Sequence, residues 1–190
     1  MSLNLPNKIT LLRVCLIPAF LVVYLTQFPF GIELANAWIA LILFSVAAIT
    51  DAIDGYLARK YKLVTNFGKL MDPLADKLLV CAALIAFAST GSLPVWAVIL
   101  LVSREFYISG LRQLALEQQI VMAATGIAKF KTITQIVLII YVLLPPPFTL
   151  LVFDIVIFVL LLITVAASVL SAWDYTWKNK QIFASEEHVK

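Results

Sequence analysis

Six long apolar segments, separated by short polar or turn-forming stretches, constrain the fold of this chain more than any other feature. A helix needs about 20 consecutive apolar residues to cross the hydrocarbon core of a bilayer. Hydrophobic residues make up 63% of the chain and charged residues only 13%, whereas a soluble domain is about 45–50% apolar and about 25% charged. The sequence therefore predicts an all-α membrane protein. Its six expected transmembrane helices cover residues 12–28, 37–58, 71–90, 94–115, 130–147 and 149–173.

The two ends of the chain lie outside these segments. Residues 2–11 mix apolar and polar side chains in a pattern typical of a short amphipathic helix in the membrane interface. Residues 178–190 are polar and are expected to form a cytoplasmic tail. No internal repeat or long linker divides the chain, so residues 1–190 are expected to form one integral membrane domain. Residues 1–37 also resemble a cleavable signal, but their apolar run is long enough to span and is expected to be retained.

Lysine and arginine occur in alternate connections between the apolar segments, while the connections at 29–36, 91–93 and 145–148 contain neither residue. The basic residues of the other connections and of the two ends are Lys8, Arg13, Arg59, Lys60, Lys62, Lys69, Lys129, Lys131, Lys178, Lys180 and Lys190. Because cytoplasmic loops carry an excess of Lys and Arg, both termini and both basic loops are expected to be cytoplasmic. The net charge of +3 is too small to indicate a nucleic-acid partner.

Four aspartates lie where the second apolar segment ends and the third begins. Asp51 and Asp54 are at i and i+3, and Asp72 and Asp76 are at i and i+4. Each spacing places both members of a pair on one helix face. The short basic connection between the two segments predicts antiparallel neighbouring helices, so the four carboxylates are expected to converge at the inner membrane surface.

A carboxylate at bilayer depth costs roughly 2.5–3.5 kcal/mol, so four of them need a compensating partner. The locus offers hard oxygen ligands without Cys or His, which favours Mg²⁺ or Mn²⁺ over zinc or copper. Four carboxylates can hold two metal ions, an arrangement suited to displacement at phosphorus. The spacing alone leaves open interhelical ion pairs or a cation pathway in a transporter. The only histidine, His188, is in the polar tail, which excludes a histidine-based triad.

The stretch DAIDGYLARKYKLVTNFGKLMDPLAD, residues 51–76, resembles the signature of the CDP-alcohol phosphotransferase family at all eight fixed positions. The resemblance implies a six-span membrane enzyme, usually a homodimer, that uses two divalent metal ions and an alcohol to displace CMP from a CDP-linked substrate. It implies four metal ligands, of which the last is also the catalytic base: Asp51, Asp54, Asp72 and Asp76. It further implies CDP binding by Gly55, Ala58, Arg59, Thr65 and Gly68, with an N-terminal contribution from Asn7 and Thr10.

A second polar group lies in the fourth and fifth segments. Arg104 and Arg112, at i and i+8, are expected to face the same side of a helix. Cations within a span must meet an anion, and Glu105 can offset one of them. The positive charges of Arg112, Lys129 and Lys131 are then expected to have no anionic partner in the chain. The phosphate of a phosphorylated acceptor substrate could pair with them. Alternatively, the two lysines extend to the membrane surface and only enforce topology.

The stretches REFYISGLR and KFKT are similar to the phosphatidylglycerophosphate synthase branch of that family, and the similarity runs from LPNKIT through KFKT. The branch commonly has a glycine where this chain has Ala128. The resemblance implies transfer of a phosphatidyl group from CDP-diacylglycerol to glycerol 3-phosphate at the bacterial inner membrane, with CMP and phosphatidylglycerol phosphate as products. Acceptors such as phosphatidylglycerol, inositol phosphate or serine stay open, as does the less favoured cation transporter.

Overall fold

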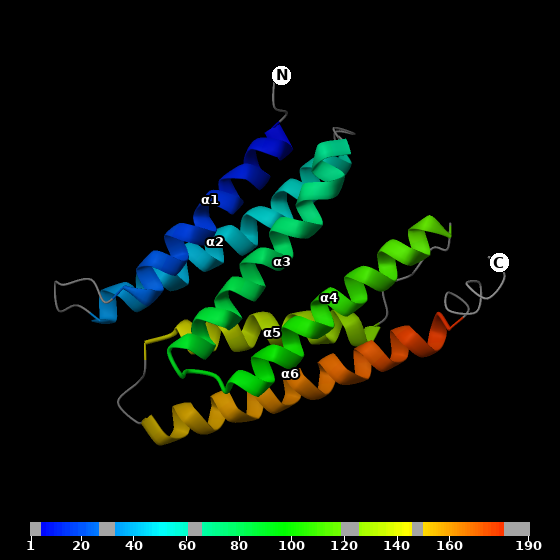
Figure 1. The fold of residues 1–190 in the computed structure, drawn as a ribbon. Helices are drawn as coiled ribbons and strands as arrows, with labels where there is room; N and C mark the ends of the chain where they lie inside the picture. Colours follow the sequence, from blue (N-terminus) through cyan, green and yellow to red (C-terminus); the bar gives the residue numbers. More distant parts are fainter. Residues whose placement is uncertain (1–4, 27–32, 61–65, 119–125, 146–149, 181–190) are drawn as a thin grey trace. The chain divides into compact units, whose positions relative to one another are not determined.

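The computed structural model describes the backbone of residues 5–26, 33–60, 66–118, 126–145 and 150–180. Within these ranges the side chains of residues 5–10, 33–34, 51–60, 66–76 and 150–151 are outside the description. The described residues form six α-helices and turns without a strand, which confirms the all-helical prediction (Figure 1). The helices are α1 Leu5–Leu25, α2 Glu33–Lys60, α3 Asn66–Ser89, α4 Val95–Glu117, α5 Gly126–Leu143 and α6 Leu150–Lys178.

The chain forms two compact units. The first comprises Met1–Leu93 and Ile139–Pro147, and therefore contains α1, α2, α3 and the end of α5. The second comprises Pro94–Leu138 and Phe148–Lys190, and contains α4, α6 and the greater part of α5.

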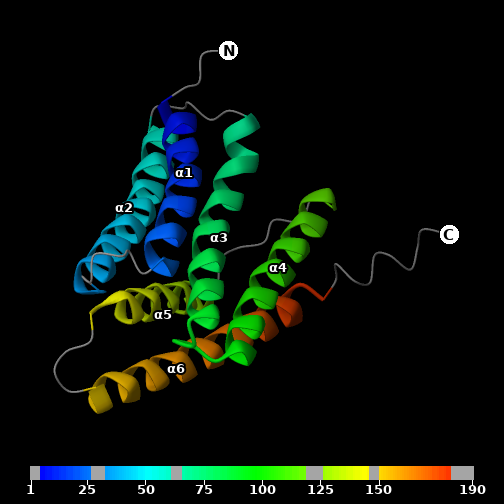
Figure 2. The same cartoon turned by 60° about the vertical axis from the view of Figure 1, so that its left-hand side comes forward.

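In the first unit α1, α2 and α3 pack side by side (Figures 1 and 2). The start of α1, the end of α2 and the start of α3 lie at the same end of this group. Aromatic side chains pack between the three helices. The ring centres of Phe20 in α1 and Phe44 in α2 are 6.0 Å apart, and those of Tyr24 in α1 and Phe87 in α3 are 5.2 Å apart. Phe20, Phe44 and Phe87 are fully or almost fully buried.

The expected interfacial helix at 2–11 is not a separate element over the residues described. Residues from Leu5 onward are the first turns of α1, which continues without a break to Leu25. Pro6 lies in the first turn, where the missing N–H has no helical partner to lose, so it does not stop the helix. No other helix-breaking residue separates this turn from the apolar run, and the helix therefore propagates.

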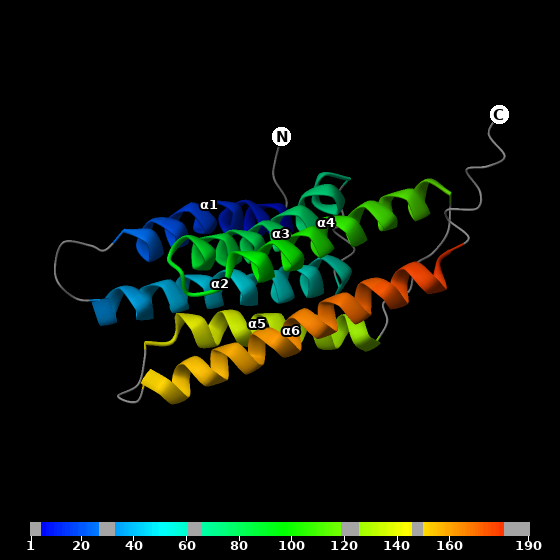
Figure 3. The same ribbon diagram turned by 60° about the horizontal axis from the view of Figure 1, so that its bottom comes forward.

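In the second unit α4 packs along α6, and the first turns of α5 also lie against α6 (Figure 3). An apolar groove of about 490 Å³ runs between these last two helices, lined by Gly126, Ile127, Phe130, Ile163, Ala166, Ala167 and Leu170. The small residues Gly126, Ala166 and Ala167 leave this space open.

Large apolar side chains are exposed on all six helices. Among the described residues, Gly126–Leu143 and Val152–Lys178 are long and apolar enough to cross a bilayer, and α1, α2 and α3 contribute shorter apolar stretches. A surface with so many exposed apolar side chains fits a lipid environment better than water. The chain is therefore associated with a membrane, and the count of six spans stays a prediction.

Candidate active site

The aspartate locus lies on two neighbouring helices. Asp51 and Asp54 belong to α2, and Asp72 and Asp76 belong to α3, which packs against α2. Their side chains lie outside the described part of the structure. The same holds for the surroundings of the predicted CDP-binding residues, of which Thr65 lies wholly outside it: Gly55, Ala58, Arg59, Thr65, Gly68, Asn7 and Thr10. The side chains that are described contain no group of three or more Asp, Glu, His or Cys that could hold a metal. Convergence of the four carboxylates therefore stays a prediction.

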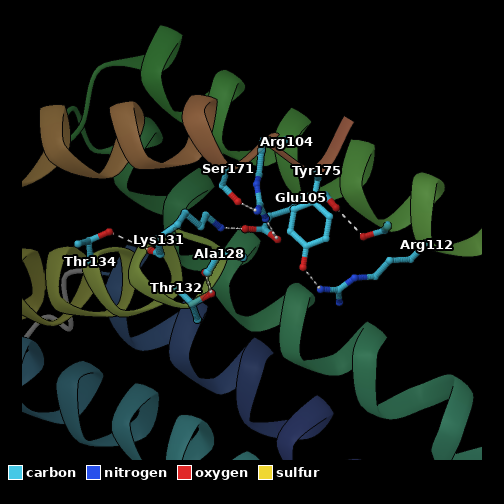
Figure 4. Close-up of polar contacts among 10 residues, drawn as sticks. Arg104, Glu105, Arg112, Ala128, Lys131, Thr132, Thr134, Ser171 and Tyr175 are labelled. Carbon is cyan, nitrogen blue, oxygen red and sulfur yellow. Dashed lines mark hydrogen bonds and ion pairs between the residues drawn. The ribbon is translucent and has the colours of Figure 1, made fainter. Parts of the chain in front are cut away.

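The second polar group forms a buried cluster around Glu105 (Figure 4). The ammonium group of Lys131, on α5, forms an ion pair with the Glu105 carboxylate, and Arg104 Nη1 lies 3.5 Å from Glu105 Oε2. Arg104 Nη2 also donates a hydrogen bond of 2.6 Å to Ser171 Oγ on α6. The Arg104 and Lys131 side chains are only 9% and 2% exposed, so three helices of the second unit hold these charges away from solvent.

Among the described side chains, this cluster carries more positive than negative charge. Two of its cations, Arg104 and Lys131, share the carboxylate of Glu105. The Nε of Arg104 is buried and donates no hydrogen bond to any group that the structure describes. A buried N–H without a partner costs about 1–3 kcal/mol, and a bound anion would remove that cost. The cluster is therefore suited to hold an anion.

Arg112 lies on the same face of α4 as Arg104. It donates a 3.2 Å hydrogen bond to the hydroxyl of Tyr175 on α6, and its guanidinium carbon lies 5.8 Å from the centre of that ring. Tyr175 is 1% exposed and packs with Ile108 and Leu111, whereas Arg112 itself is exposed. Both arginines thus reach α6, which confirms the expected i, i+8 alignment.

The expectation that Lys131 is unmatched is wrong, because its ammonium group pairs with Glu105. Its burial also excludes the alternative in which this lysine extends to the membrane surface. Lys129, two residues earlier, lies on another face of α5. It is exposed and forms no ion pair with a described side chain.

Ala128, where the related branch commonly has glycine, is accommodated without distortion. It lies in the first turns of α5, and its carbonyl accepts a 3.0 Å hydrogen bond from Thr132 Oγ1. Its side chain packs against Ile108, Leu111 and Tyr175. The methyl group thus fills space beside the cation cluster and leaves the helix regular.

Two partners of the arginines, Ser171 and Tyr175, were not predicted from the sequence. The signal was present in the last helix, where Thr164, Ser168, Ser171 and Tyr175 follow a 4, 3, 4 spacing and are all buried. A polar stripe at helical period in an otherwise apolar span indicates a face turned toward polar groups of other helices.

The family model for CDP-alcohol phosphatidyltransferases matches residues 3–173. Over 187 residues the chain is 45% identical to a Bacillus subtilis protein named CDP-diacylglycerol–glycerol-3-phosphate 3-phosphatidyltransferase, covering 93% of this chain and 95% of that one. It is 39% identical to the protein of that name from Rickettsia bellii, with 70% of each chain covered. It is also 39% identical to a probable phosphatidylglycerophosphate synthase of Mycobacterium tuberculosis, covering 75% of this chain and 66% of that one. The match extends over both units and over the aspartate locus, and the chain belongs to the CDP-alcohol phosphatidyltransferase family.

Proposed function

We propose that this protein transfers the phosphatidyl group of CDP-diacylglycerol to glycerol 3-phosphate, giving phosphatidylglycerol phosphate and CMP. The observation that carries the proposal is the 45% identity, over 93% of the chain, to a Bacillus subtilis protein named for this reaction. The relatives from Rickettsia bellii and Mycobacterium tuberculosis carry names for the same chemistry. Inositol phosphate, serine and phosphatidylglycerol are the alternative acceptors, and ion transport is the alternative from another class.

The helix faces of the first unit support convergence of the four aspartates. The buried residues Ala40, Phe44 and Ala47 follow a 4, 3 spacing along α2, and a regular helix continues this face to positions 51 and 54. On α3 the buried residues Leu79, Ala83 and Ala86 follow the same kind of spacing. Continued toward the start of α3 at the same spacing, this face includes positions 76 and 72. Both aspartate pairs are thereby expected to face the interior of the unit.

The family depends on divalent metal ions, and the donor set fits them. Four carboxylates without Cys or His are hard oxygen ligands, as Mg²⁺ and Mn²⁺ require. Asp51, Asp54, Asp72 and Asp76 would hold two ions. When bound, these ions would neutralise the diphosphate charge and the charge that develops at phosphorus.

In the proposed reaction Asp76 accepts the proton of the acceptor's free hydroxyl group. The hydroxyl oxygen then forms a bond to the phosphorus that carries diacylglycerol, while the bond from that phosphorus to the oxygen of CMP breaks. The CDP moiety would be held by residues of the signature together with two residues near the N-terminus: Gly55, Ala58, Arg59, Thr65, Gly68, Asn7 and Thr10. Small residues permit close approach of the nucleotide to the backbone, and an arginine can bind phosphate through two hydrogen bonds.

The acceptor phosphate would bind to Arg104, Arg112, Lys129 and Lys131. The buried cluster supports this assignment because, among the described side chains, its positive charge exceeds its negative charge and the Nε–H of Arg104 has no acceptor. Holding the acceptor by its phosphate orients the hydroxyl for in-line attack. The hydroxyl groups of Ser171 and Tyr175, which accept hydrogen bonds from Arg104 and Arg112, would hold the two arginines in place before the acceptor binds.

We also propose a membrane location, a topology and an oligomeric state for the protein. The chain would cross the bacterial inner membrane six times, with both termini and the active site in the cytoplasm, where glycerol 3-phosphate is available. The acyl tails of the substrate would stay in the lipid between the helices. We also propose a homodimer, as the family resemblance implies.

The deciding experiment measures CMP release by the purified protein with CDP-diacylglycerol and Mg²⁺ or Mn²⁺. Glycerol 3-phosphate, inositol phosphate, serine and phosphatidylglycerol are supplied in turn. We expect release only with glycerol 3-phosphate, and its loss on addition of a chelator. Release with a different acceptor would overturn the acceptor assignment, and no release with any of them would favour a transport assay in liposomes.

Replacing Arg112 with alanine is expected to raise KM for glycerol 3-phosphate by about 10-fold or more, because a charged hydrogen bond to phosphate contributes about 1.5–3 kcal/mol. The affinity for CDP-diacylglycerol should be unchanged. Steady-state kinetics with each substrate varied separately distinguish the two effects. The matched control is Tyr175→Phe, which removes the hydroxyl that Arg112 contacts but keeps the arginine, and should raise KM less. An equal effect on both substrates would argue against an acceptor role for Arg112.

A further inference from the structure

Arg13 is a fully buried cation inside α1. Its exposed fraction is 0%, and it shares a helix face with the buried residues Ile17 and Phe20. Leu11 and Leu12, which precede it, are exposed by about half. The helix thus turns apolar side chains outward and an arginine into the interior of the first unit. The sequence pattern treats Arg13 as one of the basic residues that orient the chain, but its burial requires a different role.

A buried arginine requires an anion, since the cost of burying an unpaired charge is large. The register of the helices indicates which anion. In the first unit α1 and α2 run in opposite directions (Figure 2). The ring centres of Phe20 and Phe44 lie 6.0 Å apart. Arg13 lies seven residues before Phe20. The position level with it on α2 is therefore seven residues after Phe44, at Asp51.

A second, independent contact gives a matching register on α3. This helix runs in the same direction as α1, and Tyr24 meets Phe87 at 5.2 Å. Arg13 lies eleven residues before Tyr24. The level position on α3 is eleven residues before Phe87, at Asp76. In a regular helix, positions 51 and 76 continue the buried faces of α2 and α3. The two counts therefore bring Arg13 to the level of one aspartate position from each pair.

We infer that Arg13 is a positioning residue of the aspartate locus: its guanidinium group is the buried counter-charge that orients the carboxylates of Asp51 and Asp76. This inference rests on the proposed role of the aspartates as metal ligands. The planar guanidinium group can donate to two carboxylates at once in a fixed geometry. It would hold the two carboxylates together before metal binds and would offset part of their mutual repulsion.

The test is a double-mutant cycle on thermal unfolding of the full-length protein in detergent, first without divalent metal. Arg13→Met is expected to lower Tm by about 5–10 °C, because it removes one member of a buried pair. Asp51→Asn should lower Tm as well. The double variant should unfold at a higher temperature than Arg13→Met alone, because neither partner then leaves an uncompensated charge.

The same variants are then measured with Mn²⁺. The metal-induced rise in Tm should be larger in Arg13→Met than in the wild type, because the ion supplies the missing positive charge. Arg13→Lys keeps the charge and should recover most of the lost stability. If Arg13→Met does not fold, Arg13→Gln replaces it in the cycle, because glutamine also removes the charge. Leu12→Met, on the exposed face of the same helix, is the matched control and should leave Tm and its metal response unchanged.

The outcomes separate this inference from the proposed function. Additive effects of Arg13 and Asp51, with equal metal responses in wild type and Arg13→Met, would mean that Arg13 only fills space and would overturn the inference. A wild type whose Tm does not respond to Mg²⁺ or Mn²⁺ would instead argue against the proposed metal site. The coupling between Arg13 and Asp51 in metal-free protein would still decide whether they pair.

Discussion

Replacing Asp76 with asparagine is expected to lower kcat for CMP release by about 10³-fold while CDP-diacylglycerol still binds. Asparagine keeps an oxygen that can face a metal ion, but it cannot accept the proton of the acceptor hydroxyl. General base catalysis contributes about 10²–10⁴-fold to such reactions, so its loss should exceed any effect on substrate affinity. CMP release under saturating substrates measures the first quantity, and equilibrium binding of CDP-diacylglycerol measures the second.

Asp154→Asn is the matched control for this change. Asp154 is an exposed aspartate of α6 and has no place in the proposed site, so its variant should keep wild-type kcat. An Asp76→Asn protein with full activity would contradict the assignment of the base. A variant that lost CDP-diacylglycerol binding as well would indicate that Asp76 acts first as a metal ligand, since substrate binding would then depend on the ion it holds.

The helices themselves could be predicted from the sequence because their signal is local. Apolar runs of about 20 residues bounded by turns are sufficient to place a helix. The end of α3 could also be predicted, because a glycine flanked by small polar residues follows it. Gly91 adopts a φ of 77°, a conformation that favours glycine, and Thr90 and Ser92 flank it. The prediction of a separate helix at residues 2–11 is wrong, because amphipathic character does not by itself end a helix.

The charge pairs could not be predicted, because they depend on how each helix is rotated about its own axis relative to its neighbours. Sequence spacing placed Arg104 and Arg112 on one face, since both belong to one helix. It could not indicate that Lys131, on another helix, would reach Glu105, or that Arg13 would point into the interior. Composition predicts which side chains need partners, and only helix packing determines which partners they find.

Replacing Glu105 with glutamine is expected to be the most destabilising single change in the cation cluster. Lys131 is 2% exposed and Arg104 9% exposed, and both would lose their shared carboxylate. Breaking a buried pair by removing one partner costs about 3–5 kcal/mol, because the remaining charge is buried without compensation. Thermal or denaturant unfolding of the purified protein in detergent measures the loss in free energy of unfolding.

The double variant Glu105→Gln/Lys131→Met should recover most of that loss, because it removes the buried ammonium group together with its carboxylate. The ion pair between Lys178 and Asp174 on α6 is the matched control, at a distance of 2.7 Å but with a lysine that is 58% exposed. Asp174 is 18% exposed, close to the 15% of Glu105, so the two pairs differ mainly in the exposure of the cation. Asp174→Asn should cost about 1 kcal/mol or less, since the ammonium group that it leaves unpaired is solvated by water. Equal losses for Glu105→Gln and Asp174→Asn would contradict the account of Glu105 as the buried counter-charge.

In that case the positive charge of the cluster would have to be stabilised by groups other than this carboxylate. Phosphate binding would then have no surplus charge to draw on, so the same measurement bears on the acceptor site.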